Sequence, residues 1–316
     1  LRNNIFSIES NSMPFKGVKL SRADIEWLLE THESSGFSGP VDPNDVQQLD
    51  RIGIDIRGAD LTGESLRRLP LAGIQAGLHG DEWLQATPEQ RIEAAANFSG
   101  CVLRYCHFER ASLSFVNFNN ANLAETHLEG ADLYGASFVY SNLEIIYLSK
   151  ETKVENIILA DKRGYGPLLA DSNISDANLG SIDWSKIRIF GEELLARGKG
   201  YLSGRESNNT LLLNYRRAVR AYRAIGQSLR TQGLNEDADR FGYRAQLCQR
   251  RVFRIEKKYG QYFLSWFLAL LAGYGYRPLR SLIAYLLVNF IFTTLYLYNS
   301  IYTTPHLTWN EALVLS

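Results

Sequence analysis

Two histidines are the residues whose spacing most directly suggests chemistry. His107 and His127 lie twenty residues apart, and in the repeat described below this spacing places them at the same outward position of adjacent coils. Paired imidazoles are a common beginning of a metal site. The next residue of the column is Tyr147, and no Cys, Asp or Glu of that column completes a ligand set. We therefore interpret the pair as an exposed ladder, like Asn122 and Asn142, and predict no metal.

Other signals for catalysis or cofactor binding are weak. The stretch GKGYLSG around Lys199 contains glycines whose amides could surround a phosphate, but its spacing fits neither G-x-G-x-x-G nor G-x-x-x-x-G-K-[ST]. A flexible linker explains it better. The sequence shows no Ser/His/Asp or Cys/His set, no H-E-x-x-H and no carboxylate pair in a predicted cleft. We predict that the protein is not an enzyme and has no catalytic residue and no cofactor.

A five-residue period dominates the middle of the chain. Neither a helix, with a period of 3.6, nor a strand, with a period of 2, accounts for it, whereas a turn every five residues does. The central residue of each repeat is then directed inward, together with a small residue two positions earlier. The central residues are Phe98, Leu103, Phe108, Leu113, Phe118, Leu123, Leu128, Leu133, Phe138, Leu143 and Leu148. Cys101 and Cys106 occupy small-residue positions, and with Cys248 they make an odd number, so we predict core thiols and no disulfide.

The register of the repeat can be followed beyond this block. Like residues recur every twenty positions, which indicates four sides per coil, and an earlier coil is centred on Ile56, Leu61, Leu66 and Leu71. Between the blocks, Thr87, Pro88 and Gln90 predict a capped helix. After Leu148 a one-residue insertion moves the next centre to Val154, and Gly164 indicates a looped-out side.

The A-(D/N)-L-x-x series resembles the pentapeptide-repeat family over about residues 54–73 and 96–186. The resemblance implies a mainly β fold, a right-handed quadrilateral β-helix. The family includes DNA-mimicking topoisomerase protectors and adaptor domains, so it implies function less specifically than fold. With the flanking segments, the predicted fold class is this β-helix (a pentapeptide-repeat solenoid) followed by an α-helical hairpin and a transmembrane helix.

The predicted domain organisation follows from these segments. Residues 1–53 form an N-terminal capping segment with a helix at about 22–32. Residues 54–190 form the solenoid, with a helical insertion at about 74–95. Residues 191–260 form a linker and a basic helical hairpin. Residues 261–316 contain an interfacial helix, a transmembrane helix at 281–302 and a truncated pore helix.

The membrane prediction depends on charge. Residues 191–280 contain 17 Lys and Arg against 7 Asp and Glu, and residues 281–302 contain no charge, a combination typical of a membrane boundary. The residues expected at the membrane interface are Trp266, Lys257, Lys258, Arg277 and Arg280. A polar stripe within the span, expected to contact another helix, consists of Asn289, Thr293 and Tyr296. The arginines of residues 210–258 are expected to attract anionic lipid rather than nucleic acid.

Several pentapeptide-repeat proteins look similar over the whole chain and carry a C-terminal, ion-channel-like membrane segment. This resemblance implies a non-catalytic protein anchored in the bacterial inner membrane, with the solenoid in the cytoplasm and the C-terminus outside. The solenoid would be a docking or regulatory module for the membrane domain. Expected partners are membrane lipid, an unknown protein and a second copy through the transmembrane helix; nucleic acid is disfavoured. The alternative is a soluble DNA-mimic or adaptor protein of the topoisomerase-protection type, although residues 96–190 contain 8 Lys and Arg against 11 Asp and Glu, only a weak negative excess.

Overall fold

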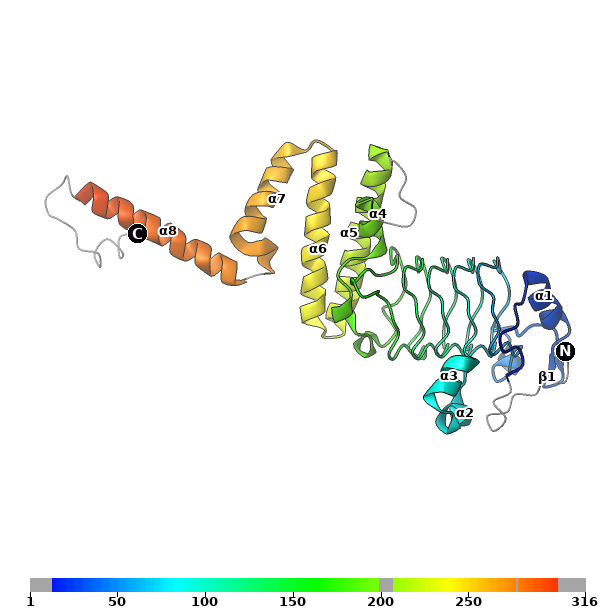
Figure 1. Ribbon diagram of the computed structural model, residues 1–316. Coiled ribbons are helices and arrows are strands. Elements are labelled where there is room, and N and C mark those ends of the chain that lie inside the picture. Colours follow the sequence, from blue (N-terminus) through cyan, green and yellow to red (C-terminus); the bar gives the residue numbers. More distant parts are fainter. Residues whose placement is uncertain (1–12, 199–206, 277, 301–316) are drawn as a thin grey trace. The chain divides into compact units, whose positions relative to one another are not determined.

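The computed structural model describes residues 13–198, 207–276 and 278–300. The chain divides into two compact units, Leu1–Phe241 and Gly242–Ser316, and the division falls inside one helix, α6 (Asn235–Ile255). The first unit contains the repeat, its N-terminal flank and the helices that follow it (Figure 1). The second contains the remaining helices. Each unit is described by itself.

The repeat forms a coil in which every side is about five residues long. Adjacent coils are joined by isolated parallel bridges between equivalent residues, such as Asn97 with Asn117, Asn122 with Asn142, and His107 with His127. In Figure 1 these turns form the stacked loops between α1 and α4. Backbone N–H groups donate along the stack, from Leu103 N to Asn122 O at 2.8 Å for example. The stacking therefore satisfies the backbone polar groups, as sheet pairing does elsewhere.

Most sides end at a corner residue in the left-handed backbone region. Gly100 has a φ of 69°, Tyr105 a φ of 61° and Ile145 a φ of 56°. A β-branched residue in this region is unusual, so the coil imposes the corner even where the sequence does not favour it. The corner turns the chain and on some sides places the last two residues at the surface, as for Arg67 and Arg68.

The interior consists of stacked apolar side chains. Phe98 and Phe118 stack with centroids 5.3 Å apart, and Phe118 and Phe138 with centroids 5.1 Å apart. All eleven central residues from Phe98 to Leu148 have relative exposures of 8% or less. Each such side chain contributes roughly 1.5–3 kcal/mol when fully buried, and its neighbours belong largely to the coils above and below. Stability is therefore shared along the stack.

The prediction of a mainly β fold is wrong. The chain is 43% helical and 10% strand, and most of the strand fraction consists of isolated bridging residues of the coil. The strands β1 (Glu33–Ser34) and β2 (Phe37–Ser38) form one two-stranded antiparallel sheet outside the coil. Each coil side pairs through a single bridging residue before the chain turns, so the repeat produces bridges instead of extended strands. Eight α-helices in the described residues supply most of the regular structure.

The N-terminal flank extends the coil by one partial turn. Lys19 forms a parallel bridge with Asp60, directly before α1 (Arg22–Glu30). Ser21 and Asp24 form a capping box at the start of this helix, and Ile25 and Leu29 are buried. A short 3₁₀ helix, η1 (Val46–Gln48), follows the small sheet. This segment thus provides apolar cover and hydrogen bonds for the first coil, whose end would otherwise be open.

Two helices interrupt the coil after its first turn. They are α2 (Gly80–Gln85) and α3 (Pro88–Ala94). The capping box of Thr87 and Gln90, with Pro88 in the first turn, begins α3 as the sequence predicts. The Trp83 ring stacks on Phe115, with centroids 5.3 Å apart, and is covered by the Arg91 guanidinium at 4.0 Å. The coil then resumes, and Asn97 pairs with Asp60 across the insertion.

The register moves by one residue where the sequence predicts it. Asp132 pairs with Lys153 instead of residue 152, and Val154 is buried. Farther on, Asn142 pairs with Leu168, because residues around Gly164 form a loop that pairs with Ile189 through Tyr165. The coil ends in the short helices η2 (Leu179–Ser181) and η3 (Trp184–Lys186).

Helices α4 (Gly191–Ala196), α5 (Asn208–Thr231) and the first residues of α6 complete the first unit. Tyr222 of α5 stacks on Phe190, with centroids 4.5 Å apart, and Phe241 of α6 lies 4.8 Å from Phe190. The Trp184 ring meets Phe241 edge-on at 6.0 Å. This aromatic cluster closes the distal end of the coil, where the sequence predicts only a linker and a basic hairpin.

The second unit contains the rest of α6, then α7 (Tyr259–Ala272), η4 (Gly273–Gly275) and α8 (Pro278–Ser300). Helices α7 and α8 contact each other. Among the described residues, none of the helices combines the length and apolarity that a membrane crossing requires. At 14 residues and about 1.5 Å per residue, α7 is too short to cross a hydrocarbon core of about 30 Å.

The predicted transmembrane helix at 281–302, and with it the channel-like segment, is therefore not supported. The prediction of a bacterial inner-membrane location, with a cytoplasmic solenoid and an outside C-terminus, is wrong on the same finding. The prediction of a transmembrane helix relied on the absence of charged residues, but uncharged polar side chains also make a helix less apolar. Asn289, Thr293 and Thr294 lie within α8, and Thr293 is fully buried instead of facing lipid. The predicted pore helix after residue 300 lies outside the described residues.

Candidate functional site

Two columns of outward residues define two sides of the coil. The Asn122 side is the one on which Val102, Asn122 and Asn142 pair, and the His127 side is the one on which His107, His127 and Tyr147 pair. Because all coils have nearly the same geometry, residues at equivalent positions of successive coils lie next to each other. The outward side chains therefore form continuous surfaces although they are separated in sequence.

An arginine cluster lies on the Asn122 side of the first coils. We use this name for Arg67, Arg68 and Arg104 around the ring of Tyr105. Their guanidinium carbons lie 5.1, 5.3 and 5.1 Å from the ring centroid. All four residues occupy the last two positions of a coil side, Arg67 and Arg68 on one coil and the other two on the next. Cation–π attraction holds the guanidinium groups about the ring.

Neighbouring groups orient this cluster. Arg104 donates hydrogen bonds from Nη2 to Glu125 Oε1 at 2.7 Å and to the Tyr105 hydroxyl at 3.2 Å. The hydrogen bond from Arg104 holds the pKa of Glu125 below its usual value, and the same bond raises the pKa of Arg104. Arg22 of α1 donates from Nη1 to the backbone oxygen of Arg67 at 3.1 Å. Arg67 and Arg68 are exposed, which leaves their guanidinium groups accessible to an anionic partner.

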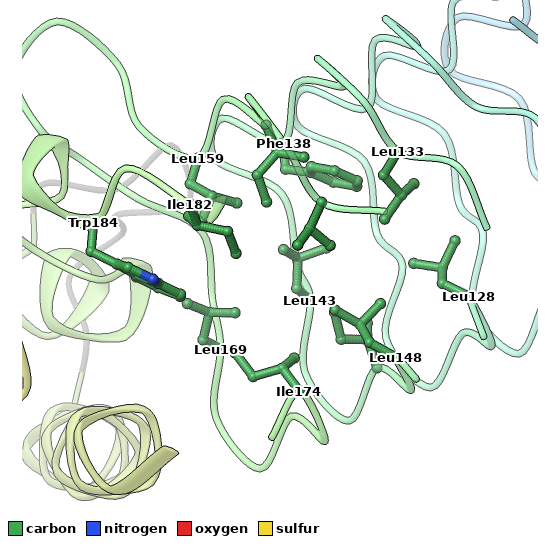
Figure 2. A pocket seen from close by; sticks show the side chains of 13 residues that line it. Leu128, Leu133, Phe138, Leu143, Leu148, Leu159, Leu169, Ile174, Ile182 and Trp184 are labelled. Atoms are coloured by element: carbon green, nitrogen blue, oxygen red, sulfur yellow. The ribbon is translucent and has the colours of Figure 1, made fainter. Parts of the chain in front are cut away.

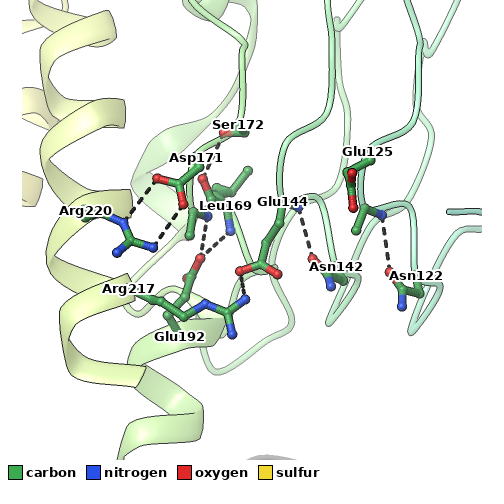
Figure 3. A network of polar contacts seen from close by, with 12 residues as sticks. Asn122, Glu125, Asn142, Glu144, Leu169, Asp171, Ser172, Glu192, Arg217 and Arg220 are labelled. Atoms are coloured by element: carbon green, nitrogen blue, oxygen red, sulfur yellow. Dashed lines mark hydrogen bonds and ion pairs between the residues drawn. The ribbon is translucent and has the colours of Figure 1, made fainter. Parts of the chain in front are cut away.

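The same side of the coil is covered by α5 at its other end. Arg217 pairs with Glu144, and Arg220 reaches both carboxylate oxygens of Asp171, at 3.2 and 3.0 Å (Figure 3). Tyr222 receives a hydrogen bond from Phe190 N at 2.9 Å and donates one to Glu193 at 2.7 Å. The basic face of α5 thus binds coil carboxylates, although the sequence suggests that these arginines attract lipid.

A buried carboxyl group lies beneath this junction. Glu192 is 1% exposed, and its Oε1 accepts hydrogen bonds from Leu169 N at 2.7 Å and Ala170 N at 2.6 Å (Figure 3). Its Oε2 has no hydrogen-bond partner in the described part of the chain. Burial raises the pKa of Glu192 to about 7, because desolvation disfavours the charged form. The sequence offers no signal for this group, since Glu192 looks like an ordinary first-turn acid of a helix.

The His127 side brings together residues that sequence reasoning kept apart. The rings of His107 and His127 stack at 4.9 Å with planes 5° apart, and Tyr147 stacks on His127 at 4.5 Å. Glu109 Oε1 lies 2.8 Å from His107 Nδ1, and Glu129 Oε1 lies 3.1 Å from His127 Nδ1. The prediction of no metal took account only of the column formed by His107, His127 and Tyr147. The H-x-E spacing was the missed signal, because residues two apart on a coil side point the same way.

A small cavity lies inside the distal coils. Its volume is about 30 Å³, and its lining is apolar, including Phe138, Leu159 and Trp184 (Figure 2). The single polar atom of the Trp184 ring, Nε1, donates to Leu179 O at 2.9 Å. The cavity is lined by residues from coils on both sides of the register slip, from Leu128 to Trp184. It contains no free group that could act as an acid, base or nucleophile.

Comparison with known proteins identifies the repeat itself. Residues 94–123 and 111–144 match the family model described as Pentapeptide repeats, in eight copies. The coil is a pentapeptide-repeat segment. Among curated protein sequences, none matches the chain. The predicted resemblance to members with a C-terminal membrane segment receives no support.

Several solved structures are similar to parts of the chain. A structure of QnrB1, a plasmid-mediated fluoroquinolone resistance protein, is 14% identical, with 38% of this chain and 62% of that chain covered and a TM-score of 0.25. A pentapeptide repeat protein from the Arabidopsis thaliana thylakoid lumen is 22% identical, with 51% and 88% covered and a TM-score of 0.25. HetL from the cyanobacterium Nostoc sp. strain PCC 7120 is 19% identical, with 36% and 52% covered and a TM-score of 0.13.

The cysteines of the pentapeptide-repeat coil are core groups. Cys101 and Cys106 are fully buried, and their thiols donate to the backbone oxygens of Leu61 at 2.8 Å and Leu66 at 3.0 Å. Burial raises the pKa of each thiol to about 12. Both thiols are therefore protonated at neutral pH, and neither can serve as a nucleophile or a metal ligand. Cys248 is also buried and is not in a disulfide.

The residues predicted for the membrane interface are spread over the second unit. Trp266 is 51% exposed, Lys257 and Lys258 are exposed, and Lys258 pairs with Glu256 at 2.7 Å. In the predicted helix-contact stripe, Asn289 is partly exposed and Thr293 is buried. Arg277 and the side chains of Arg280 and Tyr296 lie outside what the structure describes.

Proposed function

We propose that the protein is a non-catalytic binding protein, whose pentapeptide-repeat coil docks an acidic segment of a protein partner at the arginine cluster. The observation that carries the proposal is the arrangement of Arg67, Arg68 and Arg104 around Tyr105 on an exposed side of a rigid coil. An arginine guanidinium matches a carboxylate through two parallel N–H donors. Arg104 is paired with Glu125, and the exposed Arg67 and Arg68 beside it offer carboxylates a prearranged surface.

The rigidity of the coil supports binding at this position. The backbone of Arg68 and Tyr105 is held by hydrogen bonds to the next coil, from Arg68 N to Arg104 O at 3.0 Å and from Tyr105 N to Ala124 O at 3.3 Å. A partner would therefore meet side chains whose anchoring points are already fixed. Such preorganisation lowers the entropic cost of binding.

The α5 junction supports docking by the same chemistry. On the other part of the Asn122 side, two arginines of a helix pair with two coil carboxylates, Glu144 and Asp171 (Figure 3). The side is thus wide enough to hold a helix through guanidinium–carboxylate pairs. At the arginine cluster the polarity is reversed, with arginines on the coil, so the complementary partner carries the carboxylates.

The DNA-mimic alternative requires a continuous negative surface. The arginine cluster places positive charge on the Asn122 side, and residues 96–190 contain 8 Lys and Arg against 11 Asp and Glu. This distribution fits an adaptor better than a mimic of the DNA backbone. Exposed arginines could also attract nucleic acid phosphates, so duplex DNA serves as a competitor in the test.

The test measures binding of a fluorescent poly-L-glutamate peptide to the whole chain by anisotropy. The variant R67E/R68E should weaken binding about tenfold or more, because both charges face the peptide. The matched control K162E/R163E changes the net charge equally at exposed residues of the loop before Gly164, and binding should change less than about twofold. Equal weakening in both variants would overturn the assigned site. Displacement by duplex DNA at lower concentration than by free peptide would contradict a protein partner.

A further inference from the structure

We infer that His107, Glu109, His127 and Glu129 on the His127 side form a binding site for one divalent transition-metal ion. The site lies on a different side of the coil from the arginine cluster and does not depend on the docking proposal. Two residues come from each of two adjacent coils, so a bound ion would join those coils. The histidine column itself contains no carboxylate, which is why the sequence predicts no metal, but the structure supplies two carboxylates from the adjacent column of the same side.

Donor atoms of three of the four residues are close enough to share one ion, and His107 joins this group through its contact with Glu109. Ligand atoms of Glu109, His127 and Glu129 lie within 4.8 Å of one another. The Nδ1–Oε1 separations are 2.8 Å for His107–Glu109 and 3.1 Å for His127–Glu129. Metal–ligand bonds of about 2.1 Å at right angles place neighbouring donor atoms about 3 Å apart. An ion can therefore replace the hydrogen-bonded proton between an imidazole nitrogen and a carboxylate with small side-chain movements.

The backbone beneath these side chains is already ordered. His127 N donates to Cys106 O at 3.0 Å, and Phe108 N donates to His127 O at 2.8 Å. Ring stacking from His107 through His127 to Tyr147 further restricts the imidazoles. Little ordering remains to be done when an ion binds, which favours affinity.

Charge also favours a cation at this position. Oε2 of both Glu109 and Glu129 is shielded from solvent and has no hydrogen-bond partner among the described residues. The Oε1 atom of each carboxylate meets the imidazole of its own coil side. The Oε2 atoms remain to bind a cation, because a shielded polar atom without a partner is costly, and a divalent ion would neutralise both carboxylates. The nearby Arg110 donates instead to Leu49 O, at 3.2 Å. Imidazole with carboxylate selects ions such as Ni²⁺, Zn²⁺ and Cu²⁺ over Mg²⁺ and Ca²⁺, which prefer oxygen ligands alone.

The first experiment titrates the tag-free, chelator-treated chain with Ni²⁺ in a calorimeter. We expect one ion per chain, and binding about tenfold or more weaker in H127Q and in E109Q/E129Q. H79Q is the matched control, because His79 Nδ1 lies 3.8 Å from Glu82 Oε2 and the variant likewise removes one imidazole beside a carboxylate. Its affinity should equal that of the parent, and Mg²⁺ should give no binding heat.

A second measurement keeps the test valid if a variant folds poorly. The electron paramagnetic resonance spectrum of the unmodified chain with one equivalent of Cu²⁺ should show coupling to imidazole nitrogen, and Ni²⁺ should raise the thermal midpoint of the unmodified chain. No Ni²⁺ binding, equal affinity in E109Q/E129Q and the parent, or a Cu²⁺ spectrum without nitrogen coupling would each overturn the proposal.

Discussion

The two ends of the Asn122 side have the same backbone and opposite roles. Around Tyr105 the side is open and lined by arginines, whereas around Glu144 and Asp171 it carries carboxylates and is covered by α5 (Figure 3). The bridging register continues through both ends, from Ser65 to Leu168. The backbone of the coil therefore fixes where the outward side chains lie, and the chemistry of those side chains determines what binds at each end. Four predictions test whether the two ends share one kind of apolar core and differ only in their outward side chains.

The largest effect is expected in the interior. Leu103 lies beneath the arginine cluster and Leu143 beneath the α5 junction, and both are buried, at 0% and 3%. L103A and L143A should each lower the free energy of unfolding by about 2–5 kcal/mol, since each opens a cavity in a packed stack. Urea denaturation measures both. A cost below about 1 kcal/mol for either variant would show that the two ends do not share one kind of core.

The next effect belongs to the covered end. The raised pKa of Glu192, about 7 against 4.5, means that the folded chain binds a proton more tightly than the unfolded chain. Stability from this group is present below about pH 4.5 and is lost as the pH rises through about 7. From about pH 5 to about pH 8, the parent should lose about 3 kcal/mol relative to E192Q. Urea unfolding at several pH values measures the difference, and parallel curves would contradict it.

The α5 junction should depend unequally on its two arginines. The side chains of the Arg217–Glu144 pair are 28% and 14% exposed, and those of the Arg220–Asp171 pair are 54% and 50% exposed. R217A should destabilise by about 2 kcal/mol because it leaves Glu144 shielded and unpaired, and R220A by less than about 1 kcal/mol. Hydrogen exchange of α5 amides should follow the same order. Equal effects would indicate that burial does not set the strength of this junction.

The smallest effect is expected at the open end. R67E/R68E should change the free energy of unfolding by no more than about 1 kcal/mol, because the two exposed side chains give up only solvent-exposed contacts with the Tyr105 ring. Thermal and urea unfolding of the variant and of K162E/R163E give the comparison. A loss comparable to that of R217A would mean that these arginines hold the coil together instead of serving a partner.

Some features could be read from the residues alone because they depend on local rules. A central Leu or Phe every five residues has one geometric solution for burial, so the interior and the slip after Leu148 were predictable. The capping box at Thr87 was predictable as well, since it needs only neighbours along the chain. The low strand content was not predictable, because single-residue bridges form instead of strands only where each corner turns sharply.

Contacts between side chains of different coils or of distant segments were harder to predict from the sequence. Arg217 and Glu144 are 73 residues apart, and nothing in either local sequence indicates the other. The membrane prediction failed for a different reason, because it judged residues 281–302 by their lack of charge and gave no weight to the uncharged polar residues among them.

By itself, the sequence determined the five-residue period, the buried centres and the columns in which His107 meets His127, because a coil with a constant repeat maps sequence distance directly onto space. Only the tertiary structure decided that Glu109 and Glu129 join the histidines, that three arginines surround Tyr105, and that α5 covers Glu144 and Asp171. These arrangements depend on side-chain orientation and on contacts between distant segments. Both are set by the folded backbone and not by local preference.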